Sequence, residues 1–334
     1  MVSVGIPRAL LYYQYYPMWY TFFHELRAEV IVSPPTTQVM LTAGSYRVVD
    51  DTCLPVKVFV GHVLSLIGEC DYLFIPSVRS VKSKVYNCPK FLGLPDVTRA
   101  VVPESPFILD IDVDINKGKR ELFKSINKLG RHFTRNQSKI RQAAMLAWQA
   151  NLDYQQQMYR QGLTSPQGIE RMSGGPATEP KTGASQSPSI LGTIAVIGHP
   201  YLLYDELINH RFIQRLEQAH VRVLTPEMVS AEDRESAISK VVREAHWTYE
   251  DEVVGAGEHY LSRGIDGVIG IVAFGCGPDS LMMDLVRRQA RLGSTAFMSL
   301  NLDEHTAEGG MATRLEAFLD MIYRKRRQRA CASA

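Results

Sequence analysis

The sequence predicts an α/β protein with two doubly wound, Rossmann-like parallel-sheet domains that face a cleft, together with an inserted helical segment and linker. Short apolar runs alternate with longer segments of helical spacing, which is typical of parallel sheets covered by helices. This alternation occurs twice, on either side of a polar stretch. We therefore expect an N-terminal α/β domain at residues 1–117, a helical segment with a flexible linker at 118–190, and a C-terminal α/β domain at 191–334.

The first domain begins with a short β-run that ends in a Gly and Pro turn. Pro17 falls inside the segment that follows, which predicts either a kinked helix or a helix whose true first turn is at this residue. The expected elements are a strand at 2–6, a helix at 9–26, a strand at 28–33, a helix at 55–69 and strands at 71–78 and 106–113.

The middle of the chain lacks the apolar runs of a sheet. Residues 119 to about 161 are polar and almost free of Gly and Pro, so they predict one or two exposed helices. Residues 165–189 are rich in Gly, Pro, Ser and Thr and are too polar to pack, which predicts a flexible linker.

The second domain repeats the pattern of the first. The run at 265–274 is almost continuously apolar, as expected of a central parallel strand. The expected elements are a strand at 192–199, a helix at 205–220, a strand from 221, the central strand, a helix at 278–292, a strand at 295–304 and a helix at 312–328.

Composition and charge narrow the function classes. The chain is 45% hydrophobic and 22% charged, as in a soluble globular protein, and its net charge of +2 does not indicate a nucleic-acid or membrane partner. The basic run at 324–329 is interpreted as a solvated helix end. We find no signal peptide and no apolar stretch of membrane-spanning length, and the five scattered cysteines favour a reducing cytoplasm.

Three of the cysteines share a local setting. Cys53, Cys88 and Cys276 are each followed within two residues by Pro, and Cys53 and Cys276 also precede an expected helix. A sulfur near a helix N-terminus is favoured as thiolate by the unpaired N–H groups and the helix dipole. Cys276 directly follows a strand, so its thiol is expected to point into the cleft. Cys70 is interpreted as a packing residue, and Cys331 lies in the C-terminal tail.

Three converging thiolates would select zinc or an iron–sulfur cluster. The alternative is three unrelated buried thiols, and the long spacings do not decide between the two interpretations.

Other catalytic patterns are missing, and a few further residues are candidates. The chain has no P-loop, no nucleophile elbow and no dinucleotide fingerprint. His305 and Glu308 follow the last expected strand, where His305 could act as a general acid, although a surface His beside a capping Thr306 is the alternative. Arg8 follows the first strand and is a candidate for binding an anionic substrate group. Ser280, in the turn after Cys276, is also counted as a substrate-binding candidate.

Four longer stretches resemble one family: "GIPRALLYYQYYPMWYTFFHELRAEVIVSPPT", "VDDTCLPVKVFVGHV", "YNCPKFLGLPD" and "DEHTAEGGMATRLEAFLDM". Together they are similar to the uncharacterised DUF2229 group, which is related to 2-hydroxyacyl-CoA dehydratase subunits and to acyl-CoA dehydratase activase-like proteins. The resemblance covers roughly residues 1–110 and 192–323.

The resemblance implies a function and a ligand set. Related subunits hold a 4Fe-4S cluster through three cysteines with one iron left open, and those ligands would here be Cys53, Cys88 and Cys276. A separate ATP-dependent activator supplies low-potential electrons, so this chain would receive them and reduce or dehydrate a small molecule. The partner subunit would be a second copy or a paralogue. The alternatives are a non-catalytic iron–sulfur or metal-binding accessory protein, and a two-domain ligand-binding module with structural cysteines.

Overall fold

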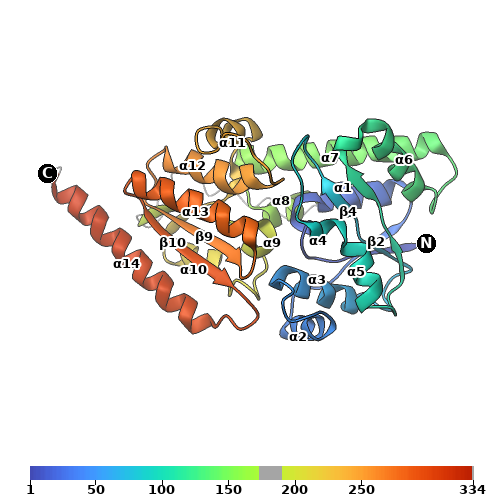
Figure 1. The fold of residues 1–334 in the computed structure, drawn as a ribbon, viewed down its shortest axis with the longest axis horizontal. Coiled ribbons are helices and arrows are strands. Elements are labelled where there is room, and N and C mark those ends of the chain that lie inside the picture. The colour runs from blue at the N-terminus through green and yellow to red at the C-terminus, as the bar shows by residue number, and fades with distance from the viewer. Residues whose placement is uncertain (173–189, 333–334) are drawn as a thin grey trace. The chain divides into compact units, whose positions relative to one another are not determined.

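The computed structural model describes residues 1–172 and 190–332, which fall into two compact units. The first unit comprises residues 1–157, 165–172 and 245–249, and the second comprises residues 158–164, 190–244 and 250–332. Both units combine helices with a parallel sheet (Figure 1), so the predicted α/β class is confirmed. The domain boundaries at 117/118 and 190/191 and the cleft stay predictions.

The first unit contains a four-stranded parallel sheet of order β2-β1-β3-β5 and a separate parallel pair, β4-β6. The strands predicted at 71–78 and 106–113 are therefore each divided in two. Pro76 lacks the amide hydrogen needed to continue the pairing of β3 with β5, so β3 ends before this residue. The strands are β1 (Ser3–Ile6), β2 (Glu29–Val32), β3 (Tyr72–Phe74), β4 (Ser77–Ser80), β5 (Phe107–Leu109) and β6 (Asp112–Asp114).

The helices of this unit decide between the two alternatives for Pro17 and correct the prediction at one place. Pro17 lies within the first helix, and residues 165–172, which were expected in the linker, form a helix; the rest of the linker lies outside the described residues. The helices are α1 (Tyr12–Glu25), α2 (Gln38–Arg47), α3 (Leu54–Ser65), α4 (Pro89–Leu92), α5 (Leu94–Val101), the 3₁₀ turn η1 (Ile115–Lys117), α6 (Lys119–Gly130), α7 (Gln137–Gln161) and α8 (Ser165–Met172). The last turn of α7, residues 158–161, is counted with the second unit.

The polar sequence of α7 predicted an exposed helix, but one of its faces is buried. Ile140, Ala143 and Ala147 are buried, and so is Tyr154, whose hydroxyl donates to the Tyr13 carbonyl at 2.7 Å. Small and apolar residues at helical spacing thus give α7 one buried face within a polar sequence.

Helices α2 and α3 cross with their backbones in contact. A β-carbon at Gly44 would lie 2.0 Å from the Lys57 carbonyl oxygen, and one at Gly61 would lie 2.2 Å from that of Met40. No larger residue fits at this crossing, which fixes the position of α3.

The second unit contains one parallel sheet of order β10-β9-β7-β8. Every residue of β9 is buried, as predicted for a central strand. The chain leaves β7 for β8 on one side and later returns to β9 on the other, so the strand order reverses between β7 and β9. The strands are β7 (Gly192–Ile197), β8 (Val221–Leu224), β9 (Gly267–Ala273) and β10 (Ala296–Leu302).

One predicted helix of the second unit is shorter than expected. Residues 205–211 are not helical, because the Asp205 carboxylate accepts the Leu207 and Ile208 N–H groups and because His210 and Arg211 have positive φ. The helices are α9 (Pro200–Leu203), α10 (Phe212–Gln218), the 3₁₀ turn η2 (Pro226–Met228), α11 (Ala231–Ile238), the π-helical turn η3 (Asp251–Gly255), α12 (Ala256–Leu261), α13 (Gly277–Leu292) and α14 (Glu308–Ala332).

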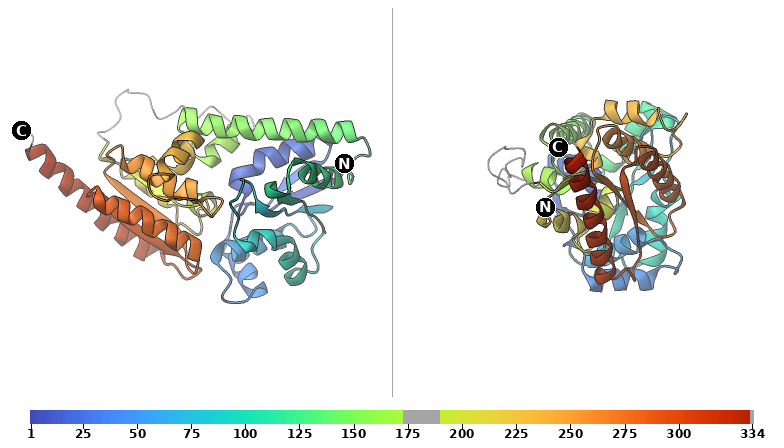
Figure 2. Two further views of the ribbon diagram at one scale, coloured as in Figure 1. Left: turned by 45° about the horizontal axis from the view of Figure 1, so that its top comes forward. Right: turned by 90° about the vertical axis from the view of Figure 1, so that its left-hand side faces the viewer.

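The last helix, α14, begins before the expected residue 312 and packs against β10. Figures 1 and 2 show that its C-terminal turns extend past the sheet, where the side chains of residues 324–328 are exposed. Within the described ranges, no helix combines the length and apolar character that crossing a bilayer requires.

Candidate functional site

In the second unit, the candidate residues gather at the carboxyl edge of the sheet. His199 follows β7 and Cys276 follows β9, so these residues mark the two strands between which the strand order reverses. In open α/β sheets, ligands bind outside the carboxyl ends of the strands at such a reversal.

Cys276 occupies a sharp turn at the start of α13. Gly275 has a φ of +76°, and the Cys276 amide donates to the Ala273 carbonyl at 3.1 Å. The Cys276 carbonyl accepts the amide of Ser280 at 3.1 Å and its hydroxyl at 2.7 Å. Apart from its immediate chain surroundings, a β-carbon at Gly275 or Gly277 would meet no heavy atom of the described chain within 4 Å. Space is therefore open beside both glycines that flank the half-buried Cys276.

A buried His–Asp pair joins the two strand ends. His199 Nε2 lies 2.7 Å from Asp279 Oδ1, and the two residues are only 5% and 4% exposed. Burial alone lowers the pKa of His199. The charge and hydrogen bond of Asp279, with the charge of Glu252, more than offset this, so the pKa is raised above its ordinary value. The pair ties the first turn of α13, and with it the Cys276 turn, to the end of β7.

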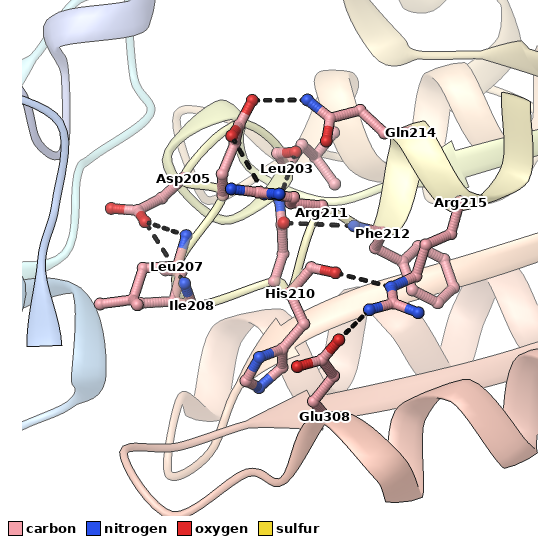
Figure 3. Close-up of polar contacts among 12 residues, drawn as sticks. Leu203, Asp205, Leu207, Ile208, His210, Arg211, Phe212, Gln214, Arg215 and Glu308 are labelled. Carbon is pink, nitrogen blue, oxygen red and sulfur yellow. Dashed lines mark hydrogen bonds and ion pairs between the residues drawn. The ribbon is translucent and has the colours of Figure 1, made fainter. Parts of the chain in front are cut away.

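His305 and Glu308 lie in and after the loop that follows β10. The His305 amide donates to Asp303 at 3.0 Å, and the His305 residue is exposed. The Thr306 hydroxyl donates to Asp303 at 2.9 Å. Figure 3 shows Glu308 paired with Arg215, whose Nε also donates to the His210 carbonyl at 2.9 Å. The carboxylate predicted as catalytic thus has an ionic partner at the surface.

In the first unit, Cys53 and Cys88 each come immediately before a helix. Cys53 is the N-cap of α3 and Cys88 the N-cap of α4, and in both helices Pro occupies one of the first two positions. Both cysteines are half-buried. The residue before Cys88, Asn87, is held by its backbone N–H, which donates to the Arg79 carbonyl at 2.8 Å.

A polar network follows the ends of β1 and β2. The Arg8 amide donates to Ser33 Oγ at 2.8 Å, and Ser33 Oγ lies 2.8 Å from His62 Nδ1. The other ring nitrogen of His62 lies 2.9 Å from Thr36 Oγ1. Burial, together with the charge of Arg8, lowers the pKa of His62 to about 3. His62 is therefore neutral at neutral pH.

The three predicted metal ligands are divided between the units, with Cys53 and Cys88 in the first and Cys276 in the second. Across residues 1–172 and 190–332, no three His, Cys, Asp or Glu side chains form a group suited to hold a metal ion. The gathering of the three sulfurs therefore stays a prediction. Cys70 packs against Gly5 of β1, and burial raises the pKa of its thiol; Cys331 is exposed near the end of α14.

His199, Asp279 and His62 were not among the site residues predicted from the sequence. A His–Pro pair directly after an apolar strand and an Asp three residues after Cys276 were available as local signals. The contact between His199 and Asp279 spans 80 residues, however, and no local pattern reveals it.

The fold and these sheet-edge residues define a two-unit parallel α/β protein with cysteines at the starts of three helices. A family model described as "CoA enzyme activase uncharacterised domain (DUF2229)" matches residues 3–229, well over half of the chain. The chain therefore belongs to the DUF2229 family. The matched range includes Arg8, Cys53, Cys88 and His199 and ends before Cys276. A search of curated proteins found no match.

Proposed function

We propose that this chain is an iron–sulfur component that receives low-potential electrons from an ATP-dependent activator and reduces or dehydrates a small molecule in the cytoplasm. Its family relates it to CoA enzyme activases. The observation that supports the proposal best is the common placement of Cys53, Cys88 and Cys276, each directly before a helix with Pro in its first two positions.

These residues suit a cluster in donor type and in local surroundings. Thiolates are the usual ligands of iron–sulfur clusters, and each of the three cysteines lies beside the unpaired N–H groups of a helix N-terminus. Open space beside Gly275 and Gly277 leaves room next to Cys276. Cys53, Cys88 and Cys276 would hold a 4Fe-4S cluster with one open iron, which supplies one-electron chemistry when bound.

The remaining roles are proposed for residues of both units. His305 is the proposed general acid, with Glu308 as its catalytic neighbour, and Arg8 and Ser280 are the proposed substrate contacts. Glu308 would first have to leave Arg215, and the Ser280 hydroxyl would have to leave the Cys276 carbonyl. The proposed partners are the activator and a second copy or paralogous subunit.

The first test is the iron and acid-labile sulfide content of the anaerobically purified chain. We expect about four of each per chain and a clear loss in Cys53→Ser, Cys88→Ser and Cys276→Ser. Cys70→Ser is the matched control, because its sulfur packs against β1, and it should retain the iron. Absence of iron after anaerobic reconstitution would contradict the proposal.

The second candidate is a two-unit ligand-binding protein whose cysteines are structural. It is favoured by the lack of a metal-binding group among the described residues. An iron-free chain that binds a ligand would support it. If iron is present, a ligand-induced change in its spectrum would distinguish a catalytic component from a non-catalytic accessory protein.

A further inference from the structure

The charge of Arg8 has no carboxylate partner among the described residues. No ion pair within residues 1–172 and 190–332 includes its guanidinium, and its Nε is buried without a hydrogen-bond partner there. Arg8 as a whole is half-buried, so atoms of the residue other than Nε are exposed to solvent. A partly desolvated cation without a counter-charge is costly, and such a group calls for an explanation by an ion or ligand.

The surroundings of Arg8 are aromatic and neutral. Its guanidinium carbon lies 5.7 Å from the centre of the Tyr12 ring, and the Tyr16 ring lies 4.8 Å from that of Tyr12. Burial raises the pKa of Tyr12, against the opposing charge of Arg8 and a hydrogen bond from the Arg8 side chain. Burial and the neighbouring tyrosines raise the pKa of Tyr16 to about 12. Both phenols therefore keep their protons and can donate hydrogen bonds.

The backbone of Arg8 is held firmly at the carboxyl end of β1. Its amide donates to Ser33 Oγ, which in turn contacts the fully buried His62. Strand β1 lies between β2 and β3, at the point where the order of the first sheet reverses. This is the position at which open α/β sheets bind ligands, and the network adds no negative charge there.

We propose that Arg8, Tyr12 and Tyr16 form an oxyanion-binding site for the phosphate or carboxylate group of a small molecule. The planar guanidinium matches either group by paired N–H donors, and the phenol hydroxyls add further donors. The ligand bound by Arg8 would therefore carry a phosphate or a carboxylate. Only the role of that ligand as a substrate rests on the proposed function. The binding itself requires no iron.

The test is calorimetric titration of the anaerobically purified full chain with three probes at constant ionic strength: inorganic phosphate, coenzyme A and lactate. Binding of phosphate and coenzyme A but not lactate would assign a phosphate site. Binding of lactate alone would assign a carboxylate site. If none of the three probes binds, the proposal is wrong.

The variants separate this site from general surface charge. Because hydrogen bonds to charged groups are stronger than those between neutral groups, Arg8→Gln should weaken binding by roughly tenfold or more. Tyr16→Phe removes one neutral donor and should weaken it by a smaller factor. Arg131→Gln, at an exposed arginine of the same unit, is the matched control and should bind as wild type. Unchanged binding in Arg8→Gln would overturn the proposal.

A measurement on wild type keeps the test decisive if Arg8→Gln does not fold. Phenylglyoxal modification followed by peptide mass spectrometry should show Arg8 protected by the bound probe and Arg131 unprotected. Equal labelling of Arg8 with and without probe would refute the site. Iron content is measured on the same samples, so loss of iron and loss of anion binding are observed separately.

Discussion

His62 illustrates how burial determines the charge of a single side chain. It is 0% exposed, and burial followed by the charge of Arg8 lowers its pKa from 6.5 to about 3. Its two ring nitrogens lie within hydrogen-bond distance of Ser33 and Thr36. The neutral imidazole thus connects the loop after β2 to α3, and protonation would place a second positive charge near Arg8.

This arrangement predicts that the first unit loses stability on acidification. Below pH 6.5 the unfolded chain takes up a proton at His62 that the folded chain does not, down to about pH 3. The free energy of unfolding should therefore fall by about 1.4 kcal/mol per pH unit in this range. Urea unfolding between pH 6.5 and 5 measures the slope.

His62→Asn keeps a partner for Ser33 but does not titrate, so it should be less stable at neutral pH and should have a flatter slope. His24→Asn, at an exposed position of α1, should keep the wild-type slope. A wild-type slope in His62→Asn would contradict the assignment.

Among the elements, the α2–α3 crossing leads to a packing prediction. Gly44→Ala places a methyl group against the Lys57 carbonyl, where backbone atoms cannot yield easily. Overpacking of this kind costs about 1–3 kcal/mol, and we expect a loss at the upper end of that range. Equilibrium unfolding in urea measures it.

Gly310→Ala provides the control. Gly310 lies in the first turn of α14, and a β-carbon there would meet no heavy atom of the described chain within 4 Å. The same substitution should raise the stability of the second unit by up to about 1 kcal/mol, because Ala favours helix. A loss at Gly310 equal to that at Gly44 would show that the crossing is not the cause.

The sequence predicted the elements whose signal is local. The apolar run at 265–274 identified β9, and the spacing after Cys276 identified α13. It failed where a side chain or a backbone conformation interrupts a periodic segment, as at Asp205 and the left-handed His210 and Arg211. It also gave no indication of α2, whose contact with α3 depends on Gly44.

The candidate site was predictable only in part, for a similar reason. A Cys followed within two residues by Pro can be recognised from three consecutive residues. The structure places Cys53, Cys88 and Cys276 at the starts of helices, as this pattern predicts. The His199–Asp279 pair depends on the adjacency of β7 and β9 in the sheet, which is a property of the fold.

For the whole molecule, the two units should respond to pH in opposite directions. His199 has a raised pKa, so the stability it contributes is fully present below pH 6.5 and is lost as the pH rises through its folded pKa. His62 has a lowered pKa, so the first unit loses stability as the pH falls below 6.5. Two compact units with separate cores should also unfold in separate steps.

Scanning calorimetry of the full chain tests this prediction. Acidification from pH 6.5 should lower the transition of the first unit, and alkaline pH should lower that of the second. Asp279→Asn removes the carboxylate that holds the His199 proton, so it should destabilise the second transition and abolish its alkaline response. A single transition whose midpoint changes in both His62→Asn and Asp279→Asn would contradict the division into units.

Residues 245–249 belong to the first unit although they lie in the sequence between β8 and β9 of the second unit. The Tyr86 amide donates to the His246 carbonyl at 3.2 Å, and the Thr248 amide donates to the Tyr86 carbonyl at 3.1 Å. During synthesis on the ribosome, the first unit therefore stays incomplete until residue 249 has emerged. The segment around Tyr86, which carries Cys88 two residues later, lacks these backbone partners until then. Under the proposed function, a cluster at Cys88 would therefore be assembled late in translation or after release.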